Sequence, residues 1–233
     1  MSEQLTLQFD TNAEQSFASF YTGSNTEAVS YLTDISNHQG EQQLFIWGDE
    51  GTGKSHLLQA CCQAAHRNKM SAFYLDIANK NLINPRVLDG LESFDLVCID
   101  NIQHCAGDKS WELGLFNFYN RQRSNNKHLL IAANCPPKFL KLQLPDLKTR
   151  LSWGLTLKLN ELSDDDLIAA FTCKAKYLGL DIPESVGEFL KNNYTRNLAD
   201  LWELLPKLEQ ATLVAKRKLS VPFLKEILLA EKR

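Results

Sequence analysis

The chain has 233 residues, 44% of them hydrophobic, so it can bury a substantial core as one domain or as a domain with a small appendage. Its formal net charge of −3 argues against strong, nonspecific DNA binding through neutralised phosphates. The polar N-terminus and the lack of an apolar run near the ~18 residues of a membrane span argue against a secretory or membrane protein, and we expect a cytoplasmic location.

The N-terminal hexapeptide at residues 4–9 reads Gln-Leu-Thr-Leu-Gln-Phe and precedes a polar, turn-prone stretch. It suits either an edge strand or a linear docking motif, in which the Gln4 amide binds a pocket rim while Leu7 and Phe9 fill an apolar groove. The hexapeptide resembles the motif Q-L-x-L-x-F by which bacterial replication proteins hold the sliding clamp of the polymerase. On that resemblance the clamp-binding residues are Gln4, Leu5, Leu7 and Phe9.

Downstream of the hexapeptide, strand-like runs alternate with helical patterns. A helical pattern through Ala28, Val29, Leu32 and Ile35 precedes five strand-like runs, at residues 44–47, 72–75, 96–100, 128–133 and 155–159. The runs at 96–100 and 128–133 are almost entirely apolar, which is typical of strands buried on both faces of a parallel sheet. We therefore expect an α/β fold with a five-stranded parallel sheet sandwiched by helices.

Residues 48–55, Gly-Asp-Glu-Gly-Thr-Gly-Lys-Ser, lie between the first strand and a helical pattern that runs to about residue 67. In this context G-x-x-x-x-G-K-[S/T] predicts a P-loop, in which backbone N–H groups surround phosphate oxygens. Lys54 would reach the terminal phosphates and Ser55 would offer its hydroxyl to Mg²⁺. A glycine-rich turn that merely starts a helix is the weaker interpretation, because the glycines, Lys54 and Ser55 all fall in register.

Asp100 ends the third predicted strand, at the edge where parallel sheets bind their ligands. We expect it to hold Mg²⁺ together with Ser55, partly through water. The next residue is Asn101, where additional-strand P-loop ATPases typically have an acid that polarises the attacking water. An amide orients water but cannot accept its proton, so we expect a weak ATPase at most.

The six cysteines show no C-x-x-C pair, and three of them fall within apolar segments. We expect small buried hydrophobes in a reducing compartment, and neither a metal site nor disulfides. The cysteines are Cys61, Cys62, Cys98, Cys105, Cys135 and Cys173.

Only helical patterns follow residue 162, beginning with Ser163 and three aspartates, which suit a helix N-terminus. Further helices are predicted from about Glu184, Leu198 and Ser220. We therefore expect an N-terminal segment (1–12), a nucleotide-binding domain (13–161) and a smaller helical domain (162–233).

These features together resemble the AAA+ domain of the bacterial DnaA family, and most closely those DnaA relatives that inactivate the initiator DnaA. The resemblance rests on residues 4–9, 16–25, 48–58, 97–102 with 106–108, 144–154 and 217–228. No helix-turn-helix pattern follows the helical domain in this sequence, which favours the regulators over the initiators. The resemblance implies an AAA+ sheet with a helical lid.

The same resemblance implies roles for single residues. Arg150 occupies the arginine-finger position, which acts on the nucleotide of a neighbouring subunit. The sensor-two arginine is replaced by Ala199, and Arg196 lies one helical turn earlier as its substitute. Asn134 occupies the sensor-one position, and the segment from Gly23 to Asn25 would border an adenine ring. The expected nucleotide-binding residues are Gly23, Asn25, Gly48, Gly51, Thr52, Gly53, Lys54, Ser55, His56, Asp100, Asn134 and Arg196.

The function implied by the resemblance is negative regulation of replication initiation. A chain holding an adenine nucleotide, ADP in preference to ATP, with Mg²⁺ would dock on the DNA-loaded sliding clamp, the β subunit of DNA polymerase III. Arg150 would then stimulate hydrolysis of DnaA-bound ATP and leave inactive DnaA-ADP. DNA would be contacted only indirectly, no membrane is involved, and pairing of two copies into a homodimer stays open.

Two other functions compete with this one. A self-acting P-loop ATPase or nucleotide kinase is disfavoured by Asn101 and Ala199. A DNA-binding initiator or loader is disfavoured by the acidic charge balance and by the lack of a helix-turn-helix pattern.

Overall fold

The computed structural model describes residues 15–193 and 198–230. Its centre is one parallel sheet of five strands in the order β2-β3-β4-β1-β5. The strands are β1 (Gln43–Trp47), β2 (Ala72–Asp76), β3 (Leu96–Asp100), β4 (His128–Ala133) and β5 (Leu155–Lys158). The expected parallel α/β sheet is confirmed, and each strand begins within one residue of its predicted start.

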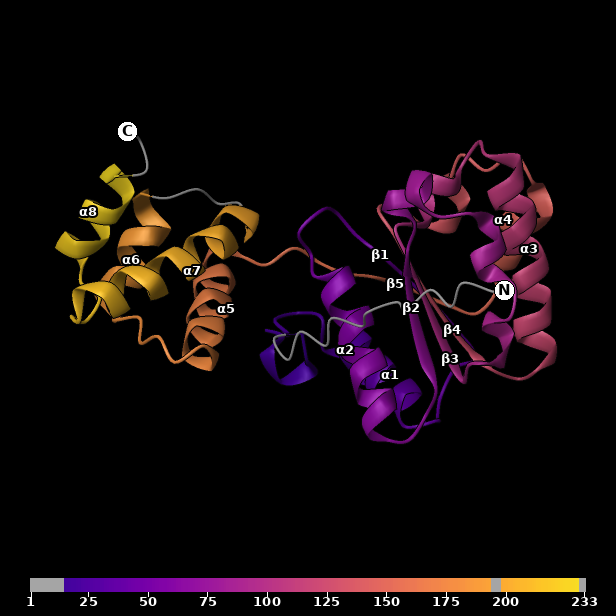
Figure 1. The fold of residues 1–233 in the computed structure, drawn as a ribbon, viewed down its shortest axis with the longest axis horizontal. Helices are drawn as coiled ribbons and strands as arrows, with labels where there is room; N and C mark the ends of the chain where they lie inside the picture. Colours follow the sequence, from indigo (N-terminus) through magenta and orange to yellow (C-terminus); the bar gives the residue numbers. More distant parts are fainter. Residues whose placement is uncertain (1–14, 194–197, 231–233) are drawn as a thin grey trace, which may run out of the picture.

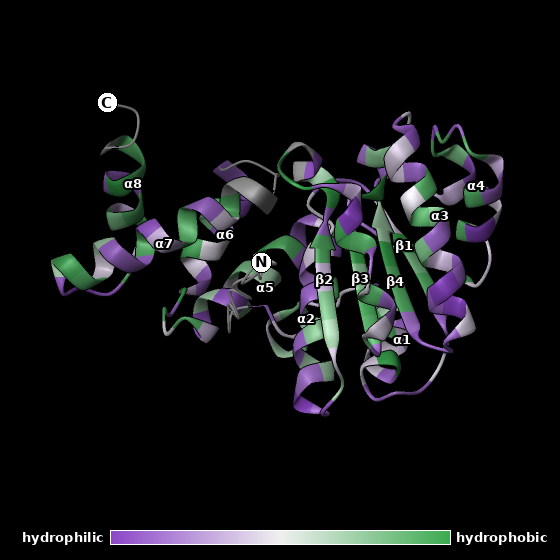
Figure 2. Ribbon diagram, turned by 45° about the vertical axis from the view of Figure 1, so that its right-hand side comes forward, coloured by the Kyte–Doolittle hydropathy of each residue, from purple (hydrophilic) through white to green (hydrophobic). Residues whose placement is uncertain are grey.

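Helices cover both faces of the sheet (Figure 1). On one face α1 (Thr26–Ser36) and α2 (Lys54–Arg67) pack on strand residues such as Leu96 and Cys98. On the other face α3 (Lys109–Ser124) and α4 (Pro145–Leu151) pack on residues such as Val97 and Ile99. Successive β3 side chains therefore enter opposite cores, which is why this strand is apolar up to its last residue, Asp100 (Figure 2).

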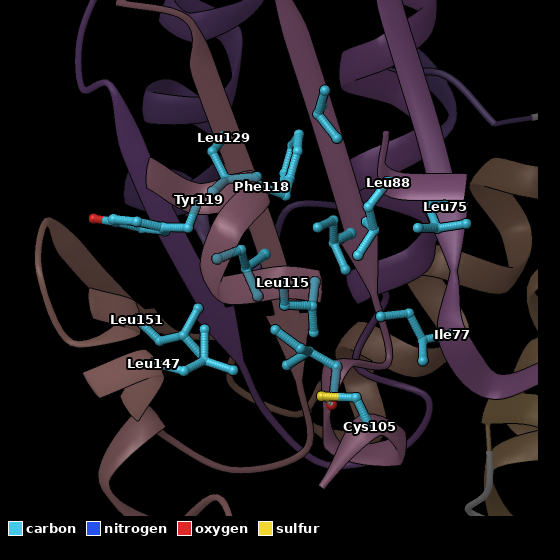
Figure 3. Close-up of a cluster of buried hydrophobic side chains, with 14 of the residues drawn as sticks. Leu75, Ile77, Leu88, Cys105, Leu115, Phe118, Tyr119, Leu129, Leu147 and Leu151 are labelled. Carbon is cyan, nitrogen blue, oxygen red and sulfur yellow. Dashed lines mark hydrogen bonds between the residues drawn. The ribbon is translucent and has the colours of Figure 1, made fainter. Parts of the chain in front are cut away.

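The core between the sheet and α3 with α4 is partly drawn in Figure 3, where Leu147 and Leu151 of α4 lie beside Leu115 and Tyr119 of α3. Four short 3₁₀ segments also belong to this side of the sheet. They span Ile77–Leu82, Pro85–Leu88, Leu91–Ser93 and Ile102–Cys105.

The helical C-terminal region contains α5 (Asp164–Tyr177), α6 (Glu184–Asn193), α7 (Leu198–Ala215) and α8 (Val221–Ala230). Its helices share a hydrophobic core of their own and form a group apart from the sheet (Figure 1). The Ser163 hydroxyl accepts a hydrogen bond from the Asp166 N–H and caps α5, as the sequence predicts.

Four of the cysteines, Cys61, Cys62, Cys98 and Cys105, are buried as predicted, whereas Cys135 is half-buried and Cys173 is exposed. Among the described residues no group of three or more histidine, cysteine or acidic side chains is arranged to hold a metal. Within the same residues no helix is long and apolar enough to cross a membrane.

Candidate nucleotide-binding site

The predicted P-loop joins the end of β1 to the start of α2 at Lys54. Gly53 has φ +91°, and a Cβ there would lie 2.6 Å from the Phe20 ring. A Cβ on Gly48 would lie 2.6 Å from the Leu159 carbonyl oxygen. Only glycine fits at these two positions, because a side chain would collide with neighbours on both sides of the loop.

The Lys54 ammonium lies inside the loop and is largely buried. It donates hydrogen bonds to the carbonyl oxygens of Gly48 (2.7 Å) and Asp49 (2.6 Å). Burial lowers the pKa of Lys54, while the nearby carboxylates of Asp100 and Asp49 partly oppose that shift. A cation is thus held where a P-loop binds phosphate oxygens.

Asp100 is completely buried at the end of β3. Its Oδ2 accepts a 2.8 Å hydrogen bond from the Tyr74 hydroxyl, and its Oδ1 accepts one of 2.8 Å from the Asn101 N–H. Burial and the nearby Asp100 carboxylate raise the pKa of Tyr74, so the phenol stays protonated and donates. The carboxylate and the Ser55 hydroxyl, in the first turn of α2, are the oxygen donors that suit Mg²⁺.

The Asn101 side chain is engaged at both ends of its amide. Its Nδ2 donates to Asp76 Oδ1 (2.9 Å), and its Oδ1 accepts from Gln103 Nε2 (3.2 Å). The backbone of Asn101 lies in the left-handed region at φ +56°. This residue is therefore fixed by its neighbours and has no group that can act as a base.

A pocket opens between the N-terminal aromatic segment, the P-loop and the helical region. It is lined by Ser19, Phe20, Tyr21, Gly51, Thr52, Gly53, His56, Leu162, Ala170, Lys174 and Trp202. The predicted residues Gly51, Thr52, Gly53 and His56 therefore share a pocket with lid residues. The pocket thus combines the glycines of the P-loop, the nearby Lys54 ammonium and aromatic rings. This combination suits a nucleotide whose phosphates lie at the P-loop.

His56 links this pocket to the N-terminal segment. Its Nε2 donates to the Ser16 carbonyl oxygen (2.9 Å), and its ring lies tilted against Phe20 at 5.3 Å between centres. Burial lowers the pKa of His56, and the positive charge of Lys174 adds to that shift. A neutral imidazole thus holds the aromatic segment beside the P-loop.

Gly23 and Asn25, expected beside an adenine ring, lie where the core meets the helical region. Gly23 has φ +49° and its Cβ position faces Leu162. The buried Asn25 amide pairs with the backbone of Asn160, donating to its carbonyl (3.1 Å) and accepting from its N–H (2.8 Å). The Tyr21 hydroxyl donates to Asp166 of α5 (2.9 Å), a second tie between the two regions.

The other predicted residues are less closely tied to the pocket. Asn134 is exposed just beyond β4, at the sheet edge that carries the P-loop. Arg196 and the clamp residues Gln4, Leu5, Leu7 and Phe9 lie outside the described residues. Sequence reasoning missed Tyr74, Lys174 and Trp202, although Trp202 follows the predicted sensor-two position by three residues in the sequence.

Arg150 lies in the last turn of α4, near the sheet edge opposite the P-loop. The Gln43 amide, at the start of β1, donates to the carbonyl oxygens of Arg150 (3.3 Å) and Leu151 (3.2 Å). The P-loop follows the other end of β1, roughly 13 Å away at about 3.3 Å of rise per residue. Arg150 therefore lies at the end of β1 that is distant from the P-loop of its own chain.

Two models of known families match the chain. Residues 11–158 match the family model of the bacterial DnaA ATPase domain. The chain belongs to this family. Residues 164–228 match a second family model, that of the Hda lid domain, so this chain is a DnaA-like AAA+ protein with an Hda-type lid.

Solved structures of the DnaA family share the fold. The chain is similar to domain III of Thermotoga maritima DnaA, with a TM-score of 0.80, 22% identity, and coverage of 94% of this chain and 97% of that domain. A replication initiator DnaA bound to AMPPCP and single-stranded DNA gives a TM-score of 0.62 at 23% identity, covering 79% of this chain and 58% of that one.

A structure from outside the DnaA family is also similar in fold. The Holliday junction motor RuvB of Thermotoga maritima gives a TM-score of 0.67 at 14% identity, covering 89% of this chain and 68% of that one.

Proposed function

We propose that this DnaA-family chain is an adapter that represses replication initiation by promoting ATP hydrolysis on DnaA. It holds an adenine nucleotide, docks on the DNA-loaded sliding clamp through residues 4–9, and applies Arg150 to the nucleotide of DnaA. The observation that carries this proposal is the position of Arg150 at the sheet edge opposite its own P-loop. A charge in that place serves a site on another molecule.

The bound nucleotide is proposed to be ADP or ATP with Mg²⁺. Its phosphates would meet the P-loop glycines and Lys54, and the cation would be held by Ser55 and Asp100. Because the pocket includes Lys174 and Trp202, an occupant would contact both the core and the lid. The nucleotide's chemical contribution is to fix the relation of these two parts, and hydrolysis at this site is not required.

Weak hydrolysis in cis is supported by the contacts of Asn101. Its amide is fixed between Asp76 and Gln103, so no side chain at this position accepts a proton from an attacking water. The adapter function needs the nucleotide to stay bound, and slow hydrolysis at this site meets that need.

Clamp docking would make the finger effective. A weak contact between Arg150 and DnaA becomes quasi-intramolecular once both proteins are held on one DNA molecule. The proposed clamp-binding residues lie outside the described part of the chain, so this step rests on their sequence alone.

The test is single-turnover hydrolysis of ATP prebound to DnaA, with clamp loaded on DNA. The intact chain is compared with Arg150→Ala, with a variant lacking residues 4–9, and with Arg67→Ala, which removes an exposed arginine from the end of α2. Arg150→Ala should lose about 10³- to 10⁵-fold of the stimulation, the range for a finger supplied in trans. Equal stimulation by Arg150→Ala and Arg67→Ala would refute the proposal.

A further inference from the structure

Two arginines from different helices contact the ring of one tryptophan. The guanidinium carbon of Arg123, at the end of α3, lies 4.4 Å from the centre of the Trp153 ring. That of Arg150, at the end of α4, lies 4.5 Å from the same centre. The indole is 41% exposed, so both cation–π contacts are made at the surface.

The backbone beneath both arginines is fixed by consecutive residues where β1 begins. The Gln42 amide donates to the Arg123 carbonyl oxygen (3.0 Å), and the Gln43 amide donates to the Arg150 carbonyl oxygen (3.3 Å). Gln43 in turn accepts a 2.6 Å hydrogen bond from the buried Tyr119 hydroxyl. The ends of α3 and α4 are thus tied to one point of the sheet, which orders the two charges relative to each other.

Neither positive charge is neutralised within the described part of the chain, where no carboxylate lies within 4.0 Å of either guanidinium. Arg121, two residues before Arg123, behaves differently and pairs with Asp89 and Glu92. Two arginines that have no carboxylate partner in the described ranges, both on one exposed ring, form a surface that favours an anion.

A cleft adjoins the pair on the side of Arg123. Gln42, Lys127 and Trp153 line it together with Arg123 and the acidic residue Glu41. Lys127 is paired with Asp95, so among the described residues that line the cleft Arg123 carries the positive charge without a carboxylate partner. The cleft leaves room for an anionic group to approach the two guanidinium planes.

We propose that Arg123 and Arg150 together form a two-arginine site for the triphosphate of the nucleotide that DnaA presents. This inference rests on the proposed function, and it assigns a second arginine to the group that acts on the nucleotide of DnaA. Each guanidinium can bind two phosphate oxygens at once, and Trp153 holds both in place through its ring. Arg123 would share the negative charge that spreads over the transferred phosphoryl group.

The experiment measures single-turnover hydrolysis of DnaA-bound ATP at saturating chain, with loaded clamp. Arg123→Ala should slow the stimulated rate by about tenfold to a hundredfold, the worth of one hydrogen bond to a charged group. Arg123→Lys keeps the charge and should retain more of the rate than Arg123→Ala. The double variant with Arg150→Ala should be no slower than Arg150→Ala alone, because the two residues act on one group.

Two controls distinguish a direct role of Arg123 from misfolding of the variant and from failure of the proposed function. Equal urea midpoints for all variants, with Arg67→Ala matching the intact chain, show that folding is retained. A preference for DnaA-ATP over DnaA-ADP that falls in Arg123→Ala supports contact with the terminal phosphate. If Arg150→Ala abolishes stimulation while Arg123→Ala stays within about twofold of the intact chain, the two-arginine site is wrong and the proposed function stands. If Arg150→Ala has no effect, both are wrong.

Discussion

The Tyr74 hydroxyl donates a 2.8 Å hydrogen bond to the Asp100 carboxylate, from β2 to its neighbour β3. Asp100 is the acid expected to hold Mg²⁺, and it is completely buried. Buried polar oxygens need hydrogen-bond donors, and among the described residues the Tyr74 hydroxyl and the Asn101 N–H donate to this carboxylate. Tyr74 therefore adjusts how strongly Asp100 attracts a cation.

Tyr74→Phe should destabilise the nucleotide-free chain and increase its dependence on Mg²⁺ with ADP. The loss of a hydrogen bond to a charged group costs about 1.5–3 kcal/mol in the free energy of unfolding. A bound cation would replace the lost hydrogen bond to the Asp100 oxygen. Added Mg-ADP should therefore raise the free energy of unfolding more for Tyr74→Phe than for the intact chain. Urea unfolding with and without Mg-ADP measures both effects.

The matched control is Tyr31→Phe, which removes a phenol hydroxyl from α1 on the same core. It should leave the response to Mg-ADP unchanged. A Tyr74→Phe variant as stable as the intact chain, with the same response to Mg-ADP, would contradict a role for this hydrogen bond.

A second prediction concerns the pair Asn101 and Asp76. Asn101→Asp places a carboxylate where an amide now donates to Asp76, so it should lower the free energy of unfolding by about 1–3 kcal/mol. Combining it with Asp76→Asn restores a donor and acceptor with their positions exchanged. Urea unfolding of the two single variants and the double variant measures the coupling, and additive losses would show that the pair does not interact.

The double variant Asn101→Asp with Asp76→Asn also tests why we expect slow ATP hydrolysis at this site. The double variant keeps the hydrogen bond but places an acid after Asp100, where an attacking water can lose its proton. Its multiple-turnover ATPase rate without partners should exceed that of the intact chain. An unchanged rate would locate the slow step elsewhere, for example in the lid.

Much of the fold could be predicted because its signals are local. The P-loop, the five strands and the starts of α5 to α8 each follow from a short run of residue types in sequence. The helices α3 and α4 were not predicted, although the buried residues Trp111, Leu115 and Phe118 of α3 recur at helical spacing.

The site was harder to predict because its members meet only through tertiary structure. Tyr74 faces Asp100 through strand pairing, and Lys174 and Trp202 reach the pocket from the lid. Asn25 is expected beside the base, and its amide pairs with the backbone of Asn160, which is 135 residues away in the sequence. No pattern in the sequence near Asn25 reveals that partner.

The position of Trp202 gives a direct optical test of nucleotide binding. Trp202 and Lys174 line the pocket, and the Lys174 ammonium lies 5.3 Å from the Trp202 ring centre. ADP should change the tryptophan emission of the intact chain, and Trp202→Phe should lose most of that change. Trp153→Phe is the matched control, because Trp153 lies near the opposite edge of the sheet and should leave the response intact.

Lys174→Ala should weaken ADP binding because it removes a positive charge beside the P-loop glycines. The loss should be about tenfold for ADP and much smaller for adenosine, which has no phosphate for the ammonium to attract. Titration of each ligand against the emission of Trp202 separates the two. Equal losses for ADP and adenosine would mean that Lys174 packs against Trp202 and does not contact phosphate.

Stability should fall as the solution is acidified through neutral pH, because two histidines are held neutral. Burial lowers the pKa of both His56 and His128, and each imidazole donates to a backbone carbonyl oxygen. In the unfolded chain a histidine titrates near pH ~6.5, so below that pH the unfolded state binds more protons than the folded state. The free energy of unfolding should therefore be highest above pH ~7, decrease as the pH falls through ~6.5, and stop decreasing only below the folded-state pKa values.

Chemical unfolding at a series of pH values between about 5.5 and 7.5 measures this slope. The double variant of His56→Gln and His128→Gln keeps a side-chain donor at each position but does not titrate, so its stability should change much less over this range. The matched control, His104→Gln, replaces an exposed histidine and should keep the full slope. If the double variant kept that slope, the loss of stability would come from other groups, and His56 and His128 would not be the cause of the pH dependence.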